Sequence, residues 1–379
     1  MTNLGWCDLT HTLFHQKLLE YQDDRFIQYI QRHQIQSIAL DYIEYQCALF
    51  DQTVHEKLKC LSREIRMENL KATIGLIELV GLFNTHNIRY MALKGPALSY
   101  ELYGDIGIRD YQDVDLWISE MDLFTVKSLL SEMGYHNLDS VDSLTIKQKN
   151  SFFKAMHHIS FQSKNGVLFE IHFRLISDDC KSQYLEFPFE SFWANRRVIH
   201  YNGSEINVMG EQDQLIFLIF HASKHGFFRM KWLIDLYTIF SQTPINWQSL
   251  IERMEQMNSR HLLVQSLLLI DDFFDTTFEK NVSDWIQPTR SEKKIKDLAK
   301  AFNLERDVKQ FRFCHKNYFR FIRYKLRMIK GLRYRLNYLL FLFRPQNKDF
   351  QKVKINDKWF ALYYLYRPIH KIIRMFKKK

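Results

Sequence analysis

Residues 157–175, HHISFQSKNGVLFEIHFRL, contain the feature that most restricts the fold of this chain. Two runs of alternating apolar and polar side chains flank Asn165-Gly166, a dipeptide that favours a two-residue β-hairpin turn. Because every second residue of a strand faces the same side, Glu170 and His172 are expected to share one face of the second strand. A second hairpin is predicted over residues 197–209.

The rest of the chain favours helices. Only 12 Gly and 6 Pro occur among 379 residues, which predicts long helices and few tight turns, and the 46% hydrophobic content excludes a disordered protein. Two further strands are expected at residues 89–94 and 114–118, with a helix over 61–88 before them. We therefore predict an α/β (α+β) fold, in which a small mixed-sheet domain is embedded in extensive helical regions. The expected units are residues 1–60 (helical), 61–209 (mixed sheet), 210–305 (helical) and 306–379 (a basic, aromatic helical tail).

Targeting features are lacking in the sequence. The five cysteines form no CxxC pair, which suits a reducing compartment with unpaired thiols. The N-terminus has neither a basic start nor an apolar core, so no signal peptide is expected. The longest late apolar run, LNYLLFLF, is shorter than the roughly 20 residues of a membrane span. A cytoplasmic location is the expectation.

Gly95 and Pro96 directly follow the strand predicted at residues 89–94. Glycine can serve as a helix N-cap, and proline fits the first helical position because its missing N–H has no partner there anyway. A helix that begins at Pro96 would point its positive end at the space above Lys94 and Gly95, which favours phosphate binding. The alternative is an ordinary turn from strand to helix.

Asp113 and Asp115 begin the strand predicted at residues 114–118 and face the same side of it. Two adjacent carboxylates repel one another, and a divalent cation such as Mg²⁺ would remove that repulsion. Glu170 supplies a third acid that could share the cation, and three clustered acids are typical of two-metal phosphoryl and nucleotidyl transfer. The alternatives are a solvated aspartate pair and an ion pair between Glu170 and Arg174.

These motifs resemble a bacterial family of uncharacterised nucleotidyltransferases within the DNA polymerase β-type superfamily. The resemblance rests on LKGPAL, LYGDIGIRDYQDVDLWI, FEIHFRL and FHASKHGFFRMKWLIDLYTI, and it covers roughly residues 60–245. The superfamily usually has Gly-Ser at the phosphate turn, a shorter gap to the first aspartate, and often aspartate as the third acid, so this chain departs from the pattern at Pro96 and Glu170. The matching positions are Lys94 and Gly95 (turn), Tyr103, Arg109 and Asp110 (loop), Asp113 and Asp115 (metal pair), and Glu170 and His172 (acid-x-His strand).

The resemblance implies Mg²⁺-dependent transfer of a nucleoside monophosphate from an NTP to an unidentified hydroxyl or phosphate acceptor. The implied catalytic and metal-binding residues are Asp113, Asp115 and Glu170, and the implied nucleotide-binding residues are Lys94, Gly95, Arg109 and His172. For Arg109, a salt bridge to Asp105 or Asp110 is the structural alternative. The alternative function is a non-catalytic nucleotide- or RNA-binding protein on the same fold that uses its basic tail.

The helix expected at residues 215–236 carries His221 and His225 at i, i+4. This spacing can bind zinc, but the HExxH glutamate is absent and no third ligand is evident. We therefore expect His221, with Trp232 and Asp235, to hold the helical region against the nucleotide site. Lys224 could reach a nucleotide phosphate.

Residues 311–379 contain 20 Lys and Arg against 2 Asp and Glu, while the chain as a whole has a net charge of +10. Six of these cations recur at helical spacing and are expected on one face of a helix. We predict that this segment meets an anionic surface, with membrane lipid ahead of RNA, which would make the protein peripheral to a membrane. The alternative is a core-packed helix with a solvated basic face. The six cations are Arg312, Lys316, Arg320, Arg323, Arg327 and Lys330.

Overall fold

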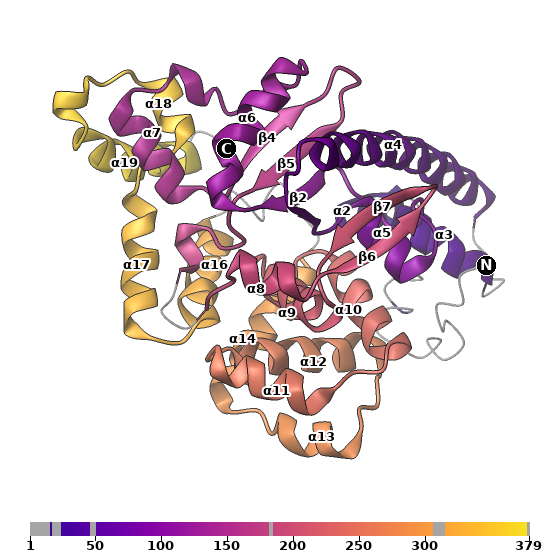
Figure 1. Ribbon diagram of the computed structural model, residues 1–379. Coiled ribbons are helices and arrows are strands. Elements are labelled where there is room, and N and C mark those ends of the chain that lie inside the picture. The colour runs from indigo at the N-terminus through magenta and orange to yellow at the C-terminus, as the bar shows by residue number, and fades with distance from the viewer. Residues whose placement is uncertain (1–15, 17–23, 46–50, 182–184, 306–314, 377–379) are drawn as a thin grey trace.

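A seven-stranded mixed sheet lies at the centre of the computed structural model (Figure 1). The structure describes residue 16 and residues 24–45, 51–181, 185–305 and 315–376. The strand order is β3-β4-β5-β2-β1-β7-β6, in which β2/β5 and β1/β7 are parallel pairs and the other neighbours are antiparallel. The strands are β1 (Tyr90–Ala92), β2 (Val114–Ile118), β3 (His136–Asn137), β4 (His158–Gln162), β5 (Leu168–His172), β6 (Arg197–Tyr201) and β7 (Ser204–Val208).

Helices surround this sheet and form most of the remaining chain. Those before and within the sheet region are α2 (Asp24–His33), α3 (Gln36–Tyr45), α4 (Gln52–Thr85), α5 (Pro96–Tyr103), α6 (Leu123–Glu132), α7 (Ile146–Ala155) and α8 (Phe189–Ala194). Those after it are α9 (Glu211–Lys224), α10 (Met230–Gln242), α11 (Trp247–Gln256), α12 (Arg260–Phe274), α13 (Lys280–Ile286), α14 (Arg290–Asn303), α16 (His315–Met328), α17 (Leu332–Phe343), α18 (Asn347–Lys352) and α19 (Leu362–Phe376). The predicted fold class, a mixed sheet embedded in helices, is confirmed.

The element boundaries differ in part from those predicted. The strand over 114–118 is confirmed, while the strand predicted over 89–94 is limited to Tyr90–Ala92. The helix predicted over 61–88 begins at Gln52, because the Asp51 side chain caps it by accepting hydrogen bonds from the N–H groups of Thr53 and Val54. The boundary predicted between residues 60 and 61 therefore falls inside α4.

The two hairpins use different turns. At Asn202-Gly203 both residues have positive φ, 48° and 78°, as a two-residue turn between β6 and β7 requires. At Asn165-Gly166 only Gly166 has a positive φ, of 84°, and its N–H donates to the Ser163 carbonyl. The predicted hairpin exists, but its predicted two-residue turn is wrong: the loop is longer, and glycine follows the turn in the left-handed conformation.

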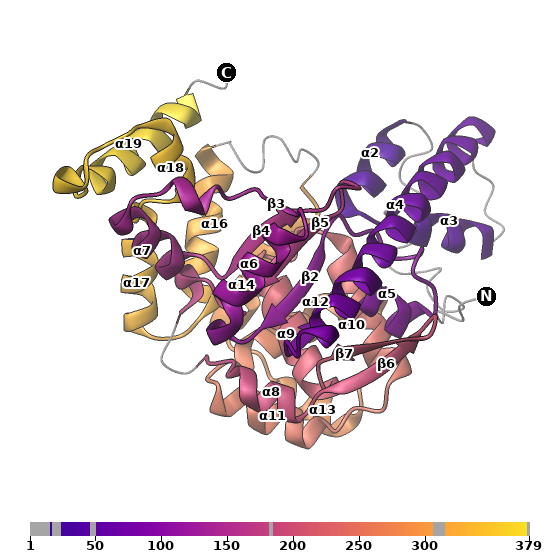
Figure 2. The same cartoon turned by 45° about the horizontal axis from the view of Figure 1, so that its top comes forward.

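The two faces of the sheet belong to two different cores. Val114, Leu116 and Ile118 of β2 pack with residues of α4 and α6. Trp117, on the opposite face of the same strand, packs with residues of α8 and of the helical region that contains α9 and α10. Figure 2 shows α4 and α6 lying over one side of the sheet and α9, α10 and α12 beyond the other. Side chains that alternate with the β2 apolar residues, including Asp115, therefore face the helical region.

The C-terminal helices are built into the fold. Tyr324 is fully buried, and its hydroxyl donates to the Ser223 carbonyl of α9, while the buried Lys325 Nζ lies 2.9 Å from Asp179 Oδ2. Gln148 of α7 donates to the Tyr363 hydroxyl of α19. These contacts support the packed-helix alternative for one face of α16. Of the six cations expected on its other face, Arg312 lies outside the described residues.

The N-terminal region is helical where it is described, at α2 and α3; residues 1–15, 17–23 and 46–50 of the predicted helical unit lie outside the described residues. Across the described ranges, none of the helices combines the length and the apolar character of a membrane span. Cys60 and Cys180 are free thiols, exposed and buried respectively.

Candidate nucleotidyltransfer site

The predicted site residues gather at a cavity of about 340 Å³ between the sheet and helices α9 and α10. The strands supply acids and histidines to it, and the helices supply cations and aromatic rings. Its lining includes Lys94, Gly95, Arg109, Asp113, Asp115, Glu170 and His172, which are all seven of the predicted site residues. It also includes His157, His158, His221, His225, Arg229, Lys231 and Trp232.

Asp113 and Asp115 differ in their environment although they share a strand face. Asp115 is 1% exposed, and its Oδ1 lies 3.2 Å from Lys94 Nζ and 2.9 Å from His172 Nε2. Burial alone would raise the pKa of Asp115, but Lys94 and His172 hold it below its ordinary value. Asp113 forms no ion pair with any described residue, and burial together with the Asp115 charge raises its pKa to about 6.

Glu170 lies beside Asp115 because β2 and β5 are parallel neighbours that pair these two residues. Its Oε2 is 3.5 Å from His172 Nε2, and its Oε1 is 3.6 Å from His158 Nε2. Burial opposes ionisation of Glu170, but the His172 hydrogen bond holds its pKa below the ordinary value. The alternative ion pair between Glu170 and Arg174 does not form, because Arg174 donates to Glu120 instead.

Asp115, Glu170 and His172 each present a ligand atom within 4.8 Å of the other two. This donor set, with Asp113 next to it, fits a divalent cation such as Mg²⁺, which favours carboxylate oxygens. Asp113 is not one of these three closely spaced donors, but its charge interacts with those of Asp115 and Glu170.

The turn from β1 to α5 has the predicted form. Gly95 is the N-cap of α5 with φ of 65°, and Pro96 opens the helix. A Cβ at position 95 would lie 3.1 Å from the carbonyl oxygen of Asp113, so the absence of a side chain lets this turn approach the aspartate strand. Lys94 is largely buried, and although burial alone would lower its pKa, Asp115 raises it, so the residue is cationic in the cavity.

The family model described as an uncharacterised nucleotidyltransferase matches residues 20–275. The chain belongs to this nucleotidyltransferase family. Two solved structures are similar to parts of the chain. One is the lincosamide antibiotic adenylyltransferase LnuA bound to lincomycin, with 14% identity over 49% of this chain and 95% of that one, and a TM-score of 0.27. The other is an antigenic nucleotidyltransferase-like protein from Paracoccidioides brasiliensis, with 16% identity over 54% and 97% and a TM-score of 0.30. No curated protein matches the sequence.

Arg109 of this nucleotidyltransferase has a different partner from those expected. Its Nε lies 3.0 Å from both carboxylate oxygens of Asp235 on α10, and both side chains are 2% exposed. The Tyr103 hydroxyl donates to the same carboxylate at 3.0 Å. The alternative of a salt bridge to Asp105 or Asp110 is therefore wrong, since Asp105 pairs with Arg66. The Arg109–Asp235 pair ties the loop before β2 to the helical region.

The helical side of the site includes two lysines that the sequence reasoning missed or left open, of which Lys231 lines the cavity and Lys224 lies behind His157. Lys231 of α10 donates to the Asp110 carbonyl at 3.0 Å, and burial with the nearby Arg109 lowers its pKa to about 7. Lys224 lies 3.3 Å from His157 Nε2, and burial lowers its pKa. Nothing in the spacing of FRMKWLIDL marks Lys231 as different from a surface lysine, because its burial depends on packing against the β2 loop.

The His221 ring packs against Trp232 as expected, with centroids 5.5 Å apart, and the His225 ring also stacks on Trp232, with centroids 5.2 Å apart. Neither histidine belongs to a group of three possible metal ligands among the described residues. The prediction that His221, Trp232 and Asp235 hold the helical region against the nucleotide site is consistent with the ring contact between His221 and Trp232 and with the ion pair between Asp235 and Arg109.

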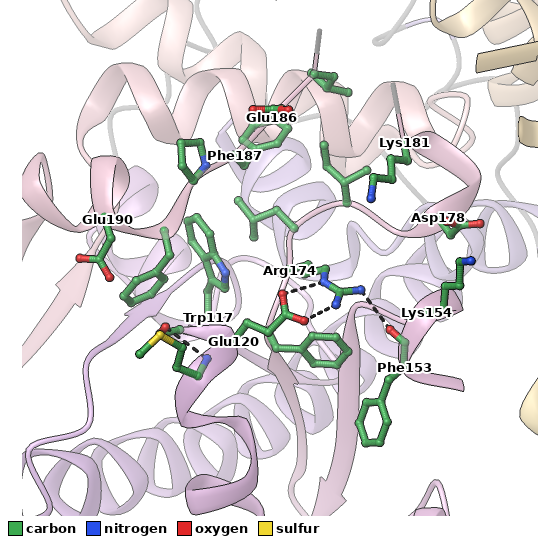
Figure 3. A pocket seen from close by; sticks show the side chains of 18 of the residues that line it. Trp117, Glu120, Phe153, Lys154, Arg174, Asp178, Lys181, Glu186, Phe187 and Glu190 are labelled. Atoms are coloured by element: carbon green, nitrogen blue, oxygen red, sulfur yellow. Dashed lines mark hydrogen bonds and ion pairs between the residues drawn. The ribbon is translucent and has the colours of Figure 1, made fainter. Parts of the chain in front are cut away.

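The cavity of about 340 Å³ that contains Asp113, Asp115 and Glu170 is called the acid cavity below. A larger cavity of about 880 Å³ adjoins it, and Leu175 lines both. Trp117 lies two residues beyond Asp115 on the same face of β2, and Arg174 follows the end of β5, so this cavity continues beyond the acids. Figure 3 shows Trp117 among the lining side chains, with Glu190 on one side of it and Lys154 and Lys181 on the other.

Proposed function

We propose that this protein transfers a nucleoside monophosphate group from an NTP to an organic acceptor, with Mg²⁺ as the cofactor and pyrophosphate as the leaving group. The observation that supports this most directly is the lining of the acid cavity. Carboxylates of β2 and β5 face cations of α10 and the β1–α5 turn across a space of about 340 Å³. A metal-bound triphosphate carries charges of both signs and matches such a lining.

Mg²⁺ would be held by Asp113, Asp115 and Glu170, and when bound it would neutralise charge on the phosphate oxygens and activate the acceptor. The chain's own groups then position the substrate. Lys94 and Lys231 would bind phosphate oxygens, and the N-terminus of α5 at Gly95 would approach the same phosphates. Because Pro96 lacks an N–H, the donors there come from the next residues of the helix.

Arg109 would support phosphate binding from the cavity wall while Asp235 fixes its orientation. His172 would hold Asp115 and Glu170 in position, since its Nε2 contacts both carboxylates. Burial opposes a charge on His172, but hydrogen bonds to the two carboxylates raise its pKa.

The acceptor would occupy the larger cavity. Its walls include five aromatic side chains, and the buried Trp117 Nε1–H has no hydrogen-bond partner in the structure. Lys154 and Lys181 line the same space without an ion pair to any described residue. An acceptor with a flat apolar part and an anionic group fits these features. The aromatic residues are Trp117, Phe153, Phe173, Phe187 and Phe189.

The test of this function is incubation of the purified protein with labelled NTPs, Mg²⁺ and a cell extract, with the label followed into new products. Transfer is expected with the native chain and is expected to disappear with Asp113→Asn or Asp115→Asn. A double Lys154→Ala/Lys181→Ala variant should raise KM for the acceptor and leave NTP affinity unchanged. NTP binding without any transfer would favour the non-catalytic alternative.

We also propose that the C-terminal helices bind an anionic lipid surface. Twelve large apolar side chains between Phe319 and Ile373 are exposed, among them Leu340 (64%), Trp359 (66%) and Leu365 (64%). The same segment has a large excess of cations. Exposed apolar groups beside cations suit the interface of an acidic membrane.

Removal of the whole segment would not be a clean test, because Tyr324 and Lys325 are part of the core. The full chain should instead sediment with acidic liposomes at low salt and be released at high salt. A triple Leu340→Glu/Trp359→Glu/Leu365→Glu variant should lose this binding, whereas Met121→Glu, an 88% exposed apolar residue elsewhere, should not. Binding to RNA but not to liposomes would contradict the lipid proposal.

A further inference from the structure

Three histidines meet at the edge of the acid cavity. His158 of β4 and His172 of β5 are cross-strand partners in the antiparallel ladder, and His157 directly precedes β4. The carbonyl of His157 accepts hydrogen bonds from the N–H groups of Phe173 and Arg174, which fixes its backbone against the end of β5. The ring centroids of the three histidines are 4.6, 5.1 and 5.3 Å apart.

Their ring nitrogens are close enough to share one ion. A nitrogen from each ring lies within 4.8 Å of one from each of the others. Nitrogens bound to one tetrahedral zinc ion are about 3.4 Å apart, since each Zn–N bond is about 2.1 Å long. Small side-chain rotations would therefore bring all three onto one ion.

The same rings contain polar atoms without partners. The Nδ1 atoms of His157, His158 and His172 are all buried and lack a hydrogen-bond partner in the structure. His172 itself is only 5% exposed. Buried polar atoms are normally satisfied, so these three nitrogens leave hydrogen-bonding or donor capacity at the histidine cluster that a ligand can use.

The donor chemistry differs from that of the carboxylate group. Asp115 and Glu170 suit Mg²⁺, whereas three imidazoles suit zinc, cobalt and similar borderline ions and are the donor set of one class of catalytic zinc site. His172 belongs to both groups, and Glu170 Oε1 lies 3.6 Å from His158 Nε2. A carboxylate is therefore available next to the imidazoles.

We propose that His157, His158 and His172 form a transition-metal site, selective for an ion such as Zn²⁺ or Co²⁺ over Mg²⁺, beside the carboxylate site of this protein. The inference does not depend on nucleotidyl transfer. The groups that face the site act in opposite directions: Glu170 and Asp115 attract a cation, and Lys224, whose Nζ lies 3.3 Å from His157 Nε2, repels one. Lys224 is thus expected to weaken metal binding.

The test uses the full chain, stripped of metal with a chelator and titrated with Co²⁺ alone. One equivalent should bind with the intense visible absorption of a four-coordinate site, and a large excess of Mg²⁺ should not remove it. His158→Phe and, separately, His157→Gln should each lower the affinity for Co²⁺ at least about tenfold. Lys224→Met should raise it.

Two controls separate this site from other ligands. Asp113→Asn should leave the visible absorption of bound Co²⁺ unchanged, although it is expected to abolish nucleotidyl transfer. His200→Phe, which removes an exposed histidine of β6, should also have no effect. Wild-type Co²⁺ affinity in a folded His158→Phe or His157→Gln protein would overturn the proposal, as would displacement of Co²⁺ by Mg²⁺. If one of these two histidine variants does not fold, the other one serves as the test.

Discussion

The acid cavity has two walls that resemble each other in their charges and are formed by different kinds of secondary structure. The strand wall is formed by β2 and β5, and the helical wall by α9 and α10. Each wall has one buried charge with an ion partner: Asp115 with Lys94 at 3.2 Å, and Asp235 with Arg109 at 3.0 Å. Each also includes a charge without an ion pair among the described residues, such as Asp113 on the strand wall and Lys231 on the helical wall.

The difference lies in what these charges do to stability. A buried charge with a close partner holds the structure together, and its loss leaves the partner uncompensated. Burial shifts the pKa of Asp113 up to about 6 and that of Lys231 down to about 7, so in both the charged form opposes folding. Buried charges without an ion partner are typical of binding and catalytic sites, where function is retained at a cost in stability.

The largest effect is expected for Asp115→Asn. It removes the carboxylate that lies between Lys94 and His172, so the free energy of unfolding should fall by about 3 kcal/mol and nucleotidyl transfer should be lost. Chemical denaturation measures the first quantity. Asp142→Asn, which neutralises a largely exposed aspartate, is the control and should change stability by less than about 0.5 kcal/mol. Equal unfolding midpoints for the two variants would show that Asp115 is not a structural charge.

Lys231→Met should change the free energy of unfolding in the opposite direction. The folded-state pKa is lowered, so the native lysine destabilises the protein at pH values below about 7, and this cost disappears as the pH approaches the ordinary lysine pKa. The variant should therefore be more stable than the native chain at pH 6, by an amount on the order of 2 kcal/mol, and should bind NTP more weakly. Lys71→Met, at an exposed position of α4, should show no pH-dependent gain. A loss of stability at pH 6 would contradict this assignment.

Asp113→Asn should also stabilise, in the opposite pH range. Because the folded-state pKa of Asp113 is raised to about 6, the native carboxylate destabilises the protein above that pH and not below about pH 4. The gain should be about 2 kcal/mol at pH 8 and should vanish at pH 4, while transfer activity is lost. Thermal unfolding across this pH range measures it. An equal gain in stability at both pH values would mean that burial of the carboxylate charge does not cause the gain.

The smallest effect is expected at the turn between β1 and α5. Gly95→Ala places a Cβ against the Asp113 carbonyl at a positive φ and should destabilise by about 1 kcal/mol. Gly81→Ala is the matched control, because Gly81 lies inside α4 with open space around it and the change should stabilise by about 0.5–1 kcal/mol. Comparison of the two by denaturation, together with NTP affinity, tests whether the turn needs glycine. If both variants stabilise, the close approach at Gly95 is not a constraint.

The strand wall was largely predictable from the sequence. Residues two apart on a strand share a face whatever the rest of the chain does, so the sequence alone pairs Asp113 with Asp115 and Glu170 with His172. The helix start at Gly95-Pro96 was equally local. The helical wall was not predictable, since the ion pair between Arg109 and Asp235 joins residues 126 positions apart. The contact of His158 with Glu170 likewise needed the hairpin register.

The sequence by itself determined the local elements of this protein: the strand that carries the two aspartates, the glycine turn before α5, and the hairpin that presents Glu170 and His172. Those features follow from backbone geometry and alternation over a few residues. Only the tertiary structure decided which charges are partnered, because burial and ion pairing depend on packing between distant elements. In the folded chain, Lys231 lies near the aspartates, Arg109 pairs with Asp235, and Lys325 of the basic tail is buried in the core. These contacts depend on the folded structure because a side chain loses water only when distant elements pack around it.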